Sequence, residues 1–440
     1  MTTAPRPVPG APSAFRLAPR VRMRLDNGMR ATLVSAGVVP TAAVRLVLRT
    51  GSADVPEGQT WLDRFIHDYL REGTEAHDAS GLADAFAALG GRFAVDADEH
   101  TTVLRTDVLA EGAPAAIGLL AEIARRSTFP ASEADRLRAD LRRSLDLVLA
   151  QPQFVTYQAF RAALYDGHPY GRLAPPPEVV DAFDPAAARS FWLGETGAHR
   201  AHLLVGGRFD EAAVTVALRE AFEDWEPGPE PAHRPPEMRR GRSLHLVDRP
   251  GAEQSTLYIG VGVPAPTHED YVPLEVTNFL LGGSFHSRIT MNIREEKGYT
   301  YSPFSAVSSR PRDAFWVETA DVTTEVTGAA LDEIVAEIEG LRAEPPNVEE
   351  LEGIQNFAAG SFVMRQATPG TILDHLEFLD LHGLDESYSE RYVERVRAVT
   401  PDLVRDMAAR YLPSAEMTIA IAGDRSRIDG QVARFGAVEG

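Results

Sequence analysis

The sequence contains no cysteine, and this absence removes several kinds of site at once. Disulfide frameworks, thiolate metal centres and cysteine nucleophiles are all excluded. The sequence also lacks an apolar run long enough to cross a bilayer. Its first 15 residues are rich in proline and alanine and lack the apolar core of a signal peptide. We therefore expect no membrane span and a cytoplasmic protein, with a periplasmic location as the alternative.

Positive charge is scarce relative to negative charge. The chain has 44 Lys and Arg against 64 Asp and Glu, which gives a net charge of -20. Such an acidic chain is a poor candidate for binding nucleic acid or anionic lipid. It suits basic peptides, although solubility alone explains the charge as well. The chain also has no P-loop, no G-x-S-x-G and no dinucleotide-binding glycine motif in a strand-turn-helix context.

The length and the spacing of prolines indicate more than one domain. With 440 residues, of which 44% are hydrophobic, the chain can bury several cores. Residues 226–238 contain five prolines and form the clearest boundary, because this stretch cannot be a helix or a central strand. We predict a disordered arm at 1–16, a first domain at 17–225, a linker at 226–238 and a second domain at 239–440.

The expected elements repeat across that boundary. Each part has a strong strand, at 42–50 and at 255–263, and each ends with an apolar strand followed by glycine, at 201–207 and at 417–423. Runs of strands and helices lie between them in both parts. The sequence therefore predicts an α+β protein made of two duplicated halves.

The most informative stretch runs from Gly282 to Ser305. An apolar segment leads into Gly282 and Gly283, and a helical pattern follows that ends at Lys297 and Gly298. A cation and a glycine are typical of a helix C-terminus. An extended run from Tyr299 to Tyr301 comes next, which we expect to be a strand. Arg294 and Tyr301 could then aim two hydrogen-bond donors at one carbonyl oxygen. The simpler alternative is a capped helix with a surface arginine and a half-buried tyrosine.

This stretch resembles the C-terminal half of the pitrilysin/insulinase family of zinc peptidases, the inverzincins. The resemblance rests on Leu-Gly-Gly at 281–283, Ser-Arg-Ile at 287–289, Arg-Glu-Glu-Lys-Gly at 294–298 and Tyr-Ser at 301–302, and it extends from about residue 21 to about residue 423. It implies two similar α/β sandwich-like halves that face each other as a clamshell around a chamber. It also implies catalytic roles for Arg294 and Tyr301 and substrate-binding roles for Gly282, Gly283 and Arg288.

The zinc motif of that family is degenerate in this chain. The active members carry H-x-x-E-H, in which two histidines bind zinc and the glutamate is the general base. The matching residues here are Arg64, His67 and Asp68, within a frame that the family shares, and the third ligand position corresponds to Ser144. A permanent cation at a ligand position repels Zn²⁺. We therefore expect no metal in this chain.

In one arrangement of the family, two half-length chains associate and only one carries the zinc motif, as in the mitochondrial processing peptidase and several bacterial two-gene peptidases. The resemblance thus implies the non-zinc subunit of a heterodimeric peptidase, inactive alone, that acts on a peptide. A homologous zinc-motif subunit would be its partner and would hold the zinc. A scaffold subunit without a peptidase role is the first alternative. A peptide-binding or escort protein that does not cleave is the second.

Overall fold

The first half of the chain forms a six-stranded sheet covered by helices. The computed structural model describes residues 15–232 and 235–439, so nearly all of the predicted N-terminal arm lies outside the described residues. The strands of this sheet are β1 Arg20–Arg24, β2 Arg30–Ser35, β3 Thr41–Leu48, β4 Ala94–Ala97, β5 Thr102–Leu109 and β6 Ala201–Gly207. The helices are α1 Leu62–Tyr69, α2 Ala79–Ala88, α3 Ala113–Arg126, α4 Ala134–Ala150, α5 Pro152–Tyr165, α6 Pro177–Asp181, α7 Pro185–Glu195 and α8 Glu211–Phe222.

The second half forms another six-stranded sheet with its own helices. Its strands are β7 Ser243–Asp248, β8 Gln254–Val263, β9 Phe304–Arg310, β10 Asp313–Thr323, β11 Thr418–Gly423 and β12 Val438–Glu439. Its helices are α9 Tyr271–Leu281, a π-helix Thr290–Glu296, α10 Thr327–Ala343, α11 Val348–Met364, α12 Pro369–His382, α13 Glu386–Arg397, α14 Pro401–Tyr411 and α15 Arg425–Val432.

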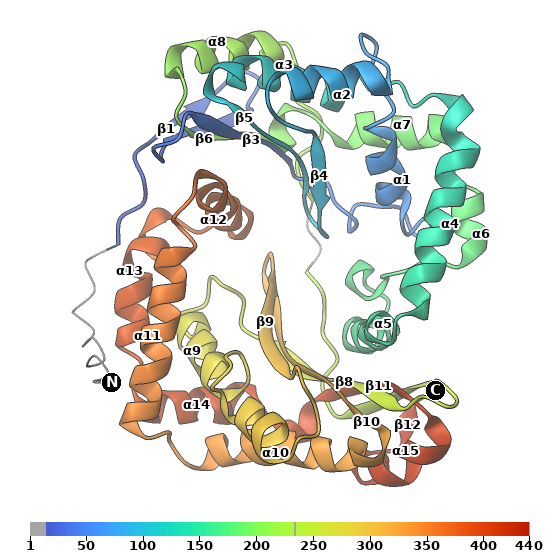
Figure 1. Cartoon of the computed structure of the whole chain (residues 1–440), viewed down its shortest axis with the longest axis vertical. Helices are drawn as coiled ribbons and strands as arrows, with labels where there is room; N and C mark the ends of the chain where they lie inside the picture. The colour runs from blue at the N-terminus through green and yellow to red at the C-terminus, as the bar shows by residue number, and fades with distance from the viewer. Residues whose placement is uncertain (1–14, 233–234, 440) are drawn as a thin grey trace, which may run out of the picture.

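The two sheets share the topology of five strands and differ at one edge, where β1 is antiparallel to β2 and β12 is parallel to β7. Their strand orders are β1-β2-β6-β3-β5-β4 and β12-β7-β11-β8-β10-β9. In each sheet a parallel pair, β2 with β6 and β7 with β11, is followed by three antiparallel pairings. The predicted duplication and the α+β class are therefore confirmed, and Figure 1 shows the two halves facing each other.

Each half supplies one helix to the sheet of the other half. Helix α12, from the second half, packs on β3 and β6 of the first sheet, and its Leu373 joins a buried cluster with Val34 and Leu204. Helix α5, from the first half, packs on β8 and β11 of the second sheet, where Phe160 joins a cluster with Phe315. In Figure 1 both helices lie between the two sheets. The two halves are therefore joined by apolar burial as well as by the linker.

Ion pairs reinforce this junction, and the one at Glu99 involves two buried arginines. Glu99, between β4 and β5, accepts hydrogen bonds from Arg161 of α5 at 2.9 Å and from Arg310 of β9 at 3.0 Å. Although burial opposes ionisation of Glu99, the two guanidinium groups lower its pKa to about 2. On α12, Asp380 pairs with both Arg30 and Arg49 of the first sheet. These contacts join residues far apart in the sequence, and they hold the two halves in one arrangement.

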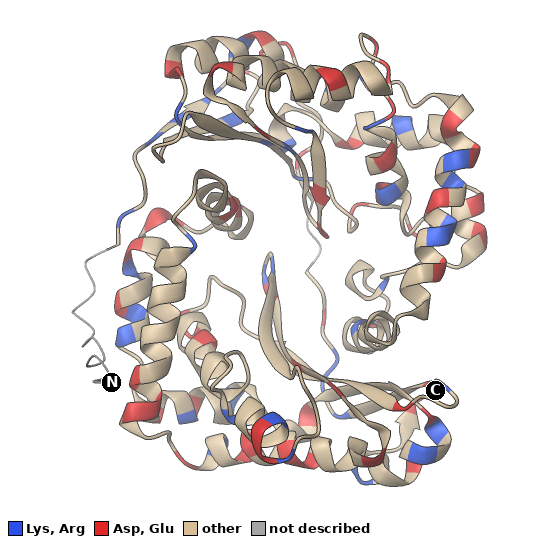
Figure 2. Cartoon of the chain, in the orientation of Figure 1, with Lys and Arg blue, Asp and Glu red and all other residues tan. Residues whose placement is uncertain are grey.

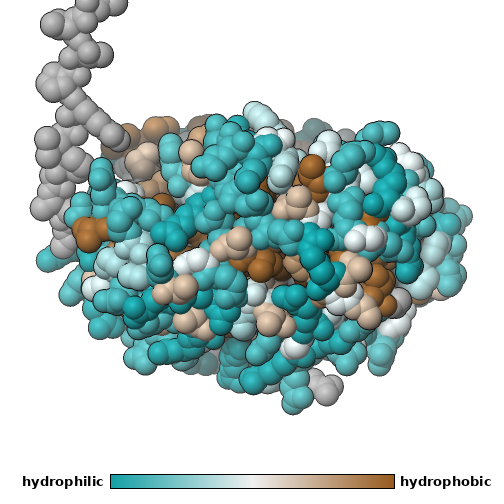
Figure 3. Space-filling model, turned by 90° about the horizontal axis from the view of Figure 1, so that it is seen from below, coloured by the Kyte–Doolittle hydropathy of each residue, from teal (hydrophilic) through white to brown (hydrophobic). Residues whose placement is uncertain are grey.

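Charged side chains gather on the outer helices. Figure 2 shows alternating acidic and basic residues along α4, while most of the strand surface is uncharged. Figure 3 shows hydrophilic residues over most of the face seen from below, with apolar residues scattered among them. Within the two described segments, no helix is both long and apolar enough to cross a membrane.

Candidate functional site

The predicted site begins at a tightly packed double glycine after α9. A Cβ atom on Gly282 would lie 2.4 Å from Oε2 of Glu318, and one on Gly283 would lie 2.4 Å from Nδ2 of Asn278. Neither neighbour can move away easily, because both side chains are buried. Glycine is therefore required at both positions for packing, whatever contact the loop makes with a substrate.

Asn278 ties this loop to the second sheet. Its Oδ1 accepts hydrogen bonds from Ser305 Oγ at 2.7 Å and from Trp316 Nε1 at 2.8 Å, and its carbonyl oxygen accepts one from the Gly283 N–H at 2.8 Å. Beside this network lies Glu318, which is fully buried, and burial raises the pKa of its carboxyl group well above the usual value. The start of the loop thus rests on a buried, hydrogen-bonded network.

The helical pattern after the glycines forms a π-helix, Thr290–Glu296, rather than an ordinary α-helix. Its Lys297 N–H donates to the carbonyl oxygen of Asn292, and Gly298 follows with φ +66°. The predicted stop at Lys297 and Gly298 is therefore confirmed. The sequence did not indicate the wider helical turn, which is a feature often found at functional sites.

Arg294 and Tyr301 come together at the surface of this element. The guanidinium carbon of Arg294 lies 4.6 Å from the ring centroid of Tyr301 and 4.6 Å from that of Phe285. Its Nε lies 3.2 Å from Oε1 of Glu295. Tyr301 is 79% exposed, so its hydroxyl group is accessible from outside the chain. The structure therefore places both predicted donors side by side, where a carbonyl oxygen could reach them.

The prediction of a strand at Tyr301 is wrong. The strand β9 begins only at Phe304, and between the π-helix and β9 a single bridge joins Thr300 to Val322. Tyr299 turns inward, since its N–H donates to the carbonyl oxygen of Ile293 and its side chain packs against the core. Tyr301 turns outward. The two tyrosines therefore do not share a face, because the chain turns here instead of extending.

Arg288 lies apart from this pair. Its Nε and Nη2 donate to the two carboxylate oxygens of Glu350 on α11, at 2.8 and 2.9 Å. This two-point pair raises the pKa of Arg288. The ion pair anchors the π-helix region to α11, and the substrate-binding role of Arg288 stays a prediction.

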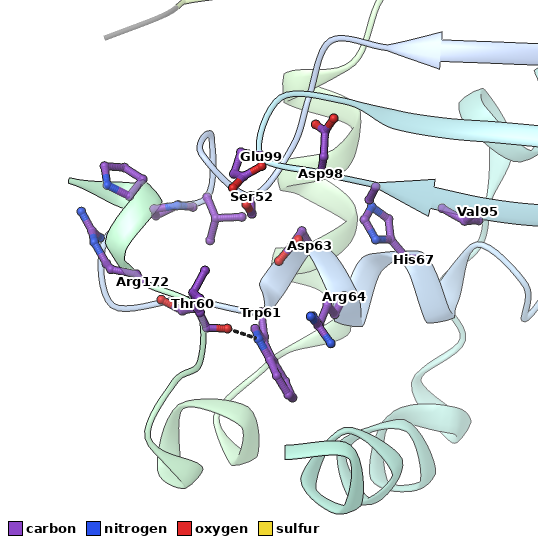
Figure 4. Close-up of a pocket in the computed structure, with 15 residues that line it drawn as sticks. Ser52, Thr60, Trp61, Asp63, Arg64, His67, Val95, Asp98, Glu99 and Arg172 are labelled. Carbon is purple, nitrogen blue, oxygen red and sulfur yellow. Dashed lines mark hydrogen bonds between the residues drawn. The ribbon is translucent and has the colours of Figure 1, made fainter. Parts of the chain in front are cut away.

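The degenerate zinc-motif positions lie on α1, in the first half. The guanidinium carbon of Arg64, at the first ligand position, lies 4.3 Å from the ring centroid of Trp61. Trp61 precedes α1 with φ 77°, and its Nε1 donates to the carbonyl oxygen of Leu173 at 2.8 Å. Trp61 and Arg64 line a cavity of about 330 Å³. Asp63 and His67 line the same cavity (Figure 4). A guanidinium group thus occupies the place of a metal ligand.

The remaining positions do not supply a ligand set either. Thr102 donates its hydroxyl hydrogen to the carbonyl oxygen of Thr50, so it accepts a hydrogen bond from His67 Nε2, 3.0 Å away. Burial and the nearby Arg71 and Arg64 lower the pKa of His67 to about 3. Asp68 lies 3.5 Å from Arg71, and burial raises its pKa.

The third ligand position, Ser144, lies on α4 and carries no carboxylate. Across residues 15–232 and 235–439, no three His, Cys, Asp or Glu side chains are grouped so that they could hold a metal ion. The residues at the family's zinc positions therefore do not fit zinc.

Two models of one peptidase family match successive parts of this chain. Residues 30–176 match the insulinase (peptidase family M16) domain, and residues 196–357 match the peptidase M16 inactive domain. The chain belongs to the M16 peptidase family. Its inactive domain contains Arg294 and Tyr301, and its insulinase domain contains the degenerate zinc-motif positions on α1.

Relatives of this M16 protein are named as proteases. A protein of Mycobacterium tuberculosis named an uncharacterized zinc protease is 28% identical over 312 residues, which cover 69% of this chain and 70% of that one. Another uncharacterized zinc protease, from Streptomyces coelicolor, is 22% identical over 395 residues, which cover 88% of this chain and 86% of that one.

Two solved structures share the fold. A peptidase M16 inactive domain from Pseudomonas fluorescens superimposes with a TM-score of 0.84 at 20% identity, and covers 92% of this chain and 98% of that one. A protease from Helicobacter pylori superimposes with a TM-score of 0.86 at 18% identity, and covers 93% of this chain and all of that one.

Sequence reasoning missed one residue of the site. Phe285 follows the double glycine, is 53% exposed and contacts the guanidinium of Arg294. The sequence did carry a signal for this residue: Phe285 is a large apolar side chain between Ser284 and His286 in a glycine-rich loop. An apolar residue exposed in such a turn indicates a contact made there.

Proposed function

We propose that this chain is the non-zinc subunit of a heterodimeric M16 zinc peptidase and that it brings Arg294 and Tyr301 to the zinc site of its partner. The observation that carries the proposal is the contrast between its two halves. The Arg294–Tyr301 pair is assembled and accessible, whereas Arg64 and a neutral His67 stand where zinc binding requires ligands and a base. A chain with this combination needs the metal site of another chain.

The chemistry of the pair suits a carbonyl oxygen that gains negative charge. Among the described residues, no acceptor is paired with the two Nη groups of Arg294. These N–H groups and the Tyr301 hydroxyl can donate hydrogen bonds to the carbonyl of the scissile peptide and to the oxyanion that forms from it. The zinc of the partner would supply the activated water. Because the donors act on developing charge, they lower the barrier rather than merely bind the substrate.

The experiment that tests this function is reconstitution with a zinc-motif M16 subunit from the same genome. We expect neither chain alone to cleave a peptide mixture and the mixed chains to do so. We also expect the two chains to elute together in sizing chromatography, with an interface on the order of 2,000 Å². A stable homodimer of this chain that ignores the zinc-motif subunit would instead favour the scaffold alternative.

A further inference from the structure

Phe285 and Tyr301 flank the same guanidinium group. The guanidinium carbon of Arg294 lies over both rings, at 4.6 Å from each centroid. The ring contact of Phe285 within the described part of the chain is with His286, at 5.3 Å between centroids, and not with Tyr301. The two rings therefore approach the guanidinium from different sides.

The neighbours of Arg294 determine which edge of its guanidinium group stays open. Glu295 lies beside Nε at 3.2 Å, so the two rings and this carboxylate leave the Nη edge as the open side. A guanidinium group donates hydrogen bonds only in its own plane. Whatever fixes that plane therefore fixes the direction in which Arg294 can donate. Without the two rings beside it, the guanidinium could turn further toward Glu295.

The loop that carries Phe285 is itself held firmly. The Gly283 N–H donates to the Asn278 carbonyl oxygen at 2.8 Å, and Ser287 Oγ donates to Thr290 Oγ1 at 2.9 Å. Phe285 lies between these two anchors and is 53% exposed, so its ring contributes little to the core. Its position is explained by the contact with Arg294 rather than by burial.

We propose that Phe285 is a positioning residue for Arg294: its ring and that of Tyr301 clamp the guanidinium so that the Nη edge faces the substrate carbonyl. The inference rests on the proposed function, because the direction of donation matters only if Arg294 serves a reaction. It adds a residue that the motif of the resemblance does not contain, and it gives Tyr301 a second task beside its own hydroxyl group.

The test compares three variants. Phe285→Leu keeps apolar bulk but removes the aromatic face, and Phe285→Trp restores an aromatic face. Phe304→Leu is the matched control, since Phe304 is a phenylalanine of nearly the same exposure, 52%, and lies at the start of β9. The first readout is the NMR signal of the Arg294 Nε–H group in the full chain, assigned by its loss in Arg294→Ala. We expect Phe285→Leu to shift this signal, because the ring current is lost, and we expect Phe304→Leu to leave it in place.

The second readout is steady-state kinetics of the reconstituted pair. Cation–π contacts are worth roughly threefold to thirtyfold, so Phe285→Leu should lower kcat by about that factor with little change in KM, and Phe285→Trp should recover most of it. An unchanged NMR signal in Phe285→Leu would overturn the clamp. An unchanged kcat would overturn the positioning role while the proposed function stands, provided that Arg294→Ala lowers kcat. If Arg294→Ala has no effect, the proposed function fails and this inference fails with it.

Discussion

The guanidinium carbon of Arg294 lies 4.6 Å from the ring centroid of Tyr301, although the π-helix end and Gly298 separate the two residues along the chain. This contact places two donors of different character at one exposed point. The tyrosine ring supports the arginine, and its hydroxyl group remains accessible. The arrangement leads to predictions about both residues and about the two halves that hold them.

Tyr301→Phe should lower kcat of the reconstituted pair by roughly a hundredfold to a thousandfold, with a much smaller effect on KM. The substitution removes only a hydroxyl group from an exposed ring, so folding and subunit association should survive. Tyr299→Phe is the internal control, since Tyr299 packs against the core and does not reach Arg294. Steady-state kinetics decides. A large loss in Tyr299→Phe together with a change of less than about twofold in Tyr301→Phe would show that the wrong tyrosine has been assigned.

The purified chain should contain no stoichiometric zinc. Arg64, a neutral His67, Asp68 and Ser144 do not form a ligand set, and the guanidinium of Arg64 repels a cation. Metal analysis after dialysis against a mild chelator checks this expectation. About one zinc per chain after that treatment would contradict this expectation.

Much of the fold could be predicted because its signals are local. The strong strands and the proline-rich stretch each depend on neighbouring residues, and the structure has β3 at Thr41–Leu48 and β6 at Ala201–Gly207, where strands were expected. The exchange of α5 and α12 between the two halves was not predictable. The apolar residues of both helices would be buried in either arrangement, and only the assembled structure shows which sheet each helix covers.

The site also has a part that could be predicted from the sequence and a part that could not. The resemblance identified Arg294 and Tyr301 because the motif is contiguous in sequence. The geometry around them was not accessible, since the apolar pattern does not distinguish a π-helix from an α-helix, nor the turn at Tyr301 from a strand. The clamp by Phe285 depends on that geometry, and a sequence pattern does not encode it.

Removing the carboxylate that pairs with two buried arginines between the halves should destabilise the chain. Glu99→Gln leaves Arg161 and Arg310 without their common anion, and breaking such a buried pair costs about 3–5 kcal/mol. Asp96→Asn is the control, because Asp96 pairs with Arg105 on the surface and such pairs contribute about 0–1 kcal/mol. Urea unfolding of both variants measures the difference. Equal stabilities would show that the ion pairs of Glu99 contribute no more to stability than a surface pair does.

Glu377 on α12 should make the stability depend on pH. Burial, and then the nearby Asp98, raise its pKa from 4.5 to about 7. Because the folded state holds this proton more tightly, the stabilisation is present at pH 4.5 and is lost as the pH rises toward 7. Glu377→Gln should therefore be more stable than the parent at pH 8 by on the order of 2 kcal/mol and show a flatter pH profile.

Urea unfolding between pH 4.5 and pH 8 tests this, with the exposed Glu352→Gln as the control, which should leave the profile unchanged. If Glu377→Gln follows the parent at every pH, the ionisation of Glu377 is not coupled to folding.

The most direct test of the central claim is the rate of peptide cleavage after this chain is mixed with a zinc-motif M16 subunit from the same genome. We predict cleavage by the mixture and none by either chain alone. When this chain carries Arg294→Ala, we predict that kcat of the mixture falls by about a hundredfold or more. Two results would contradict the account: cleavage at an undiminished rate when this chain carries Arg294→Ala, or cleavage at that rate by the zinc-motif subunit in the absence of this chain.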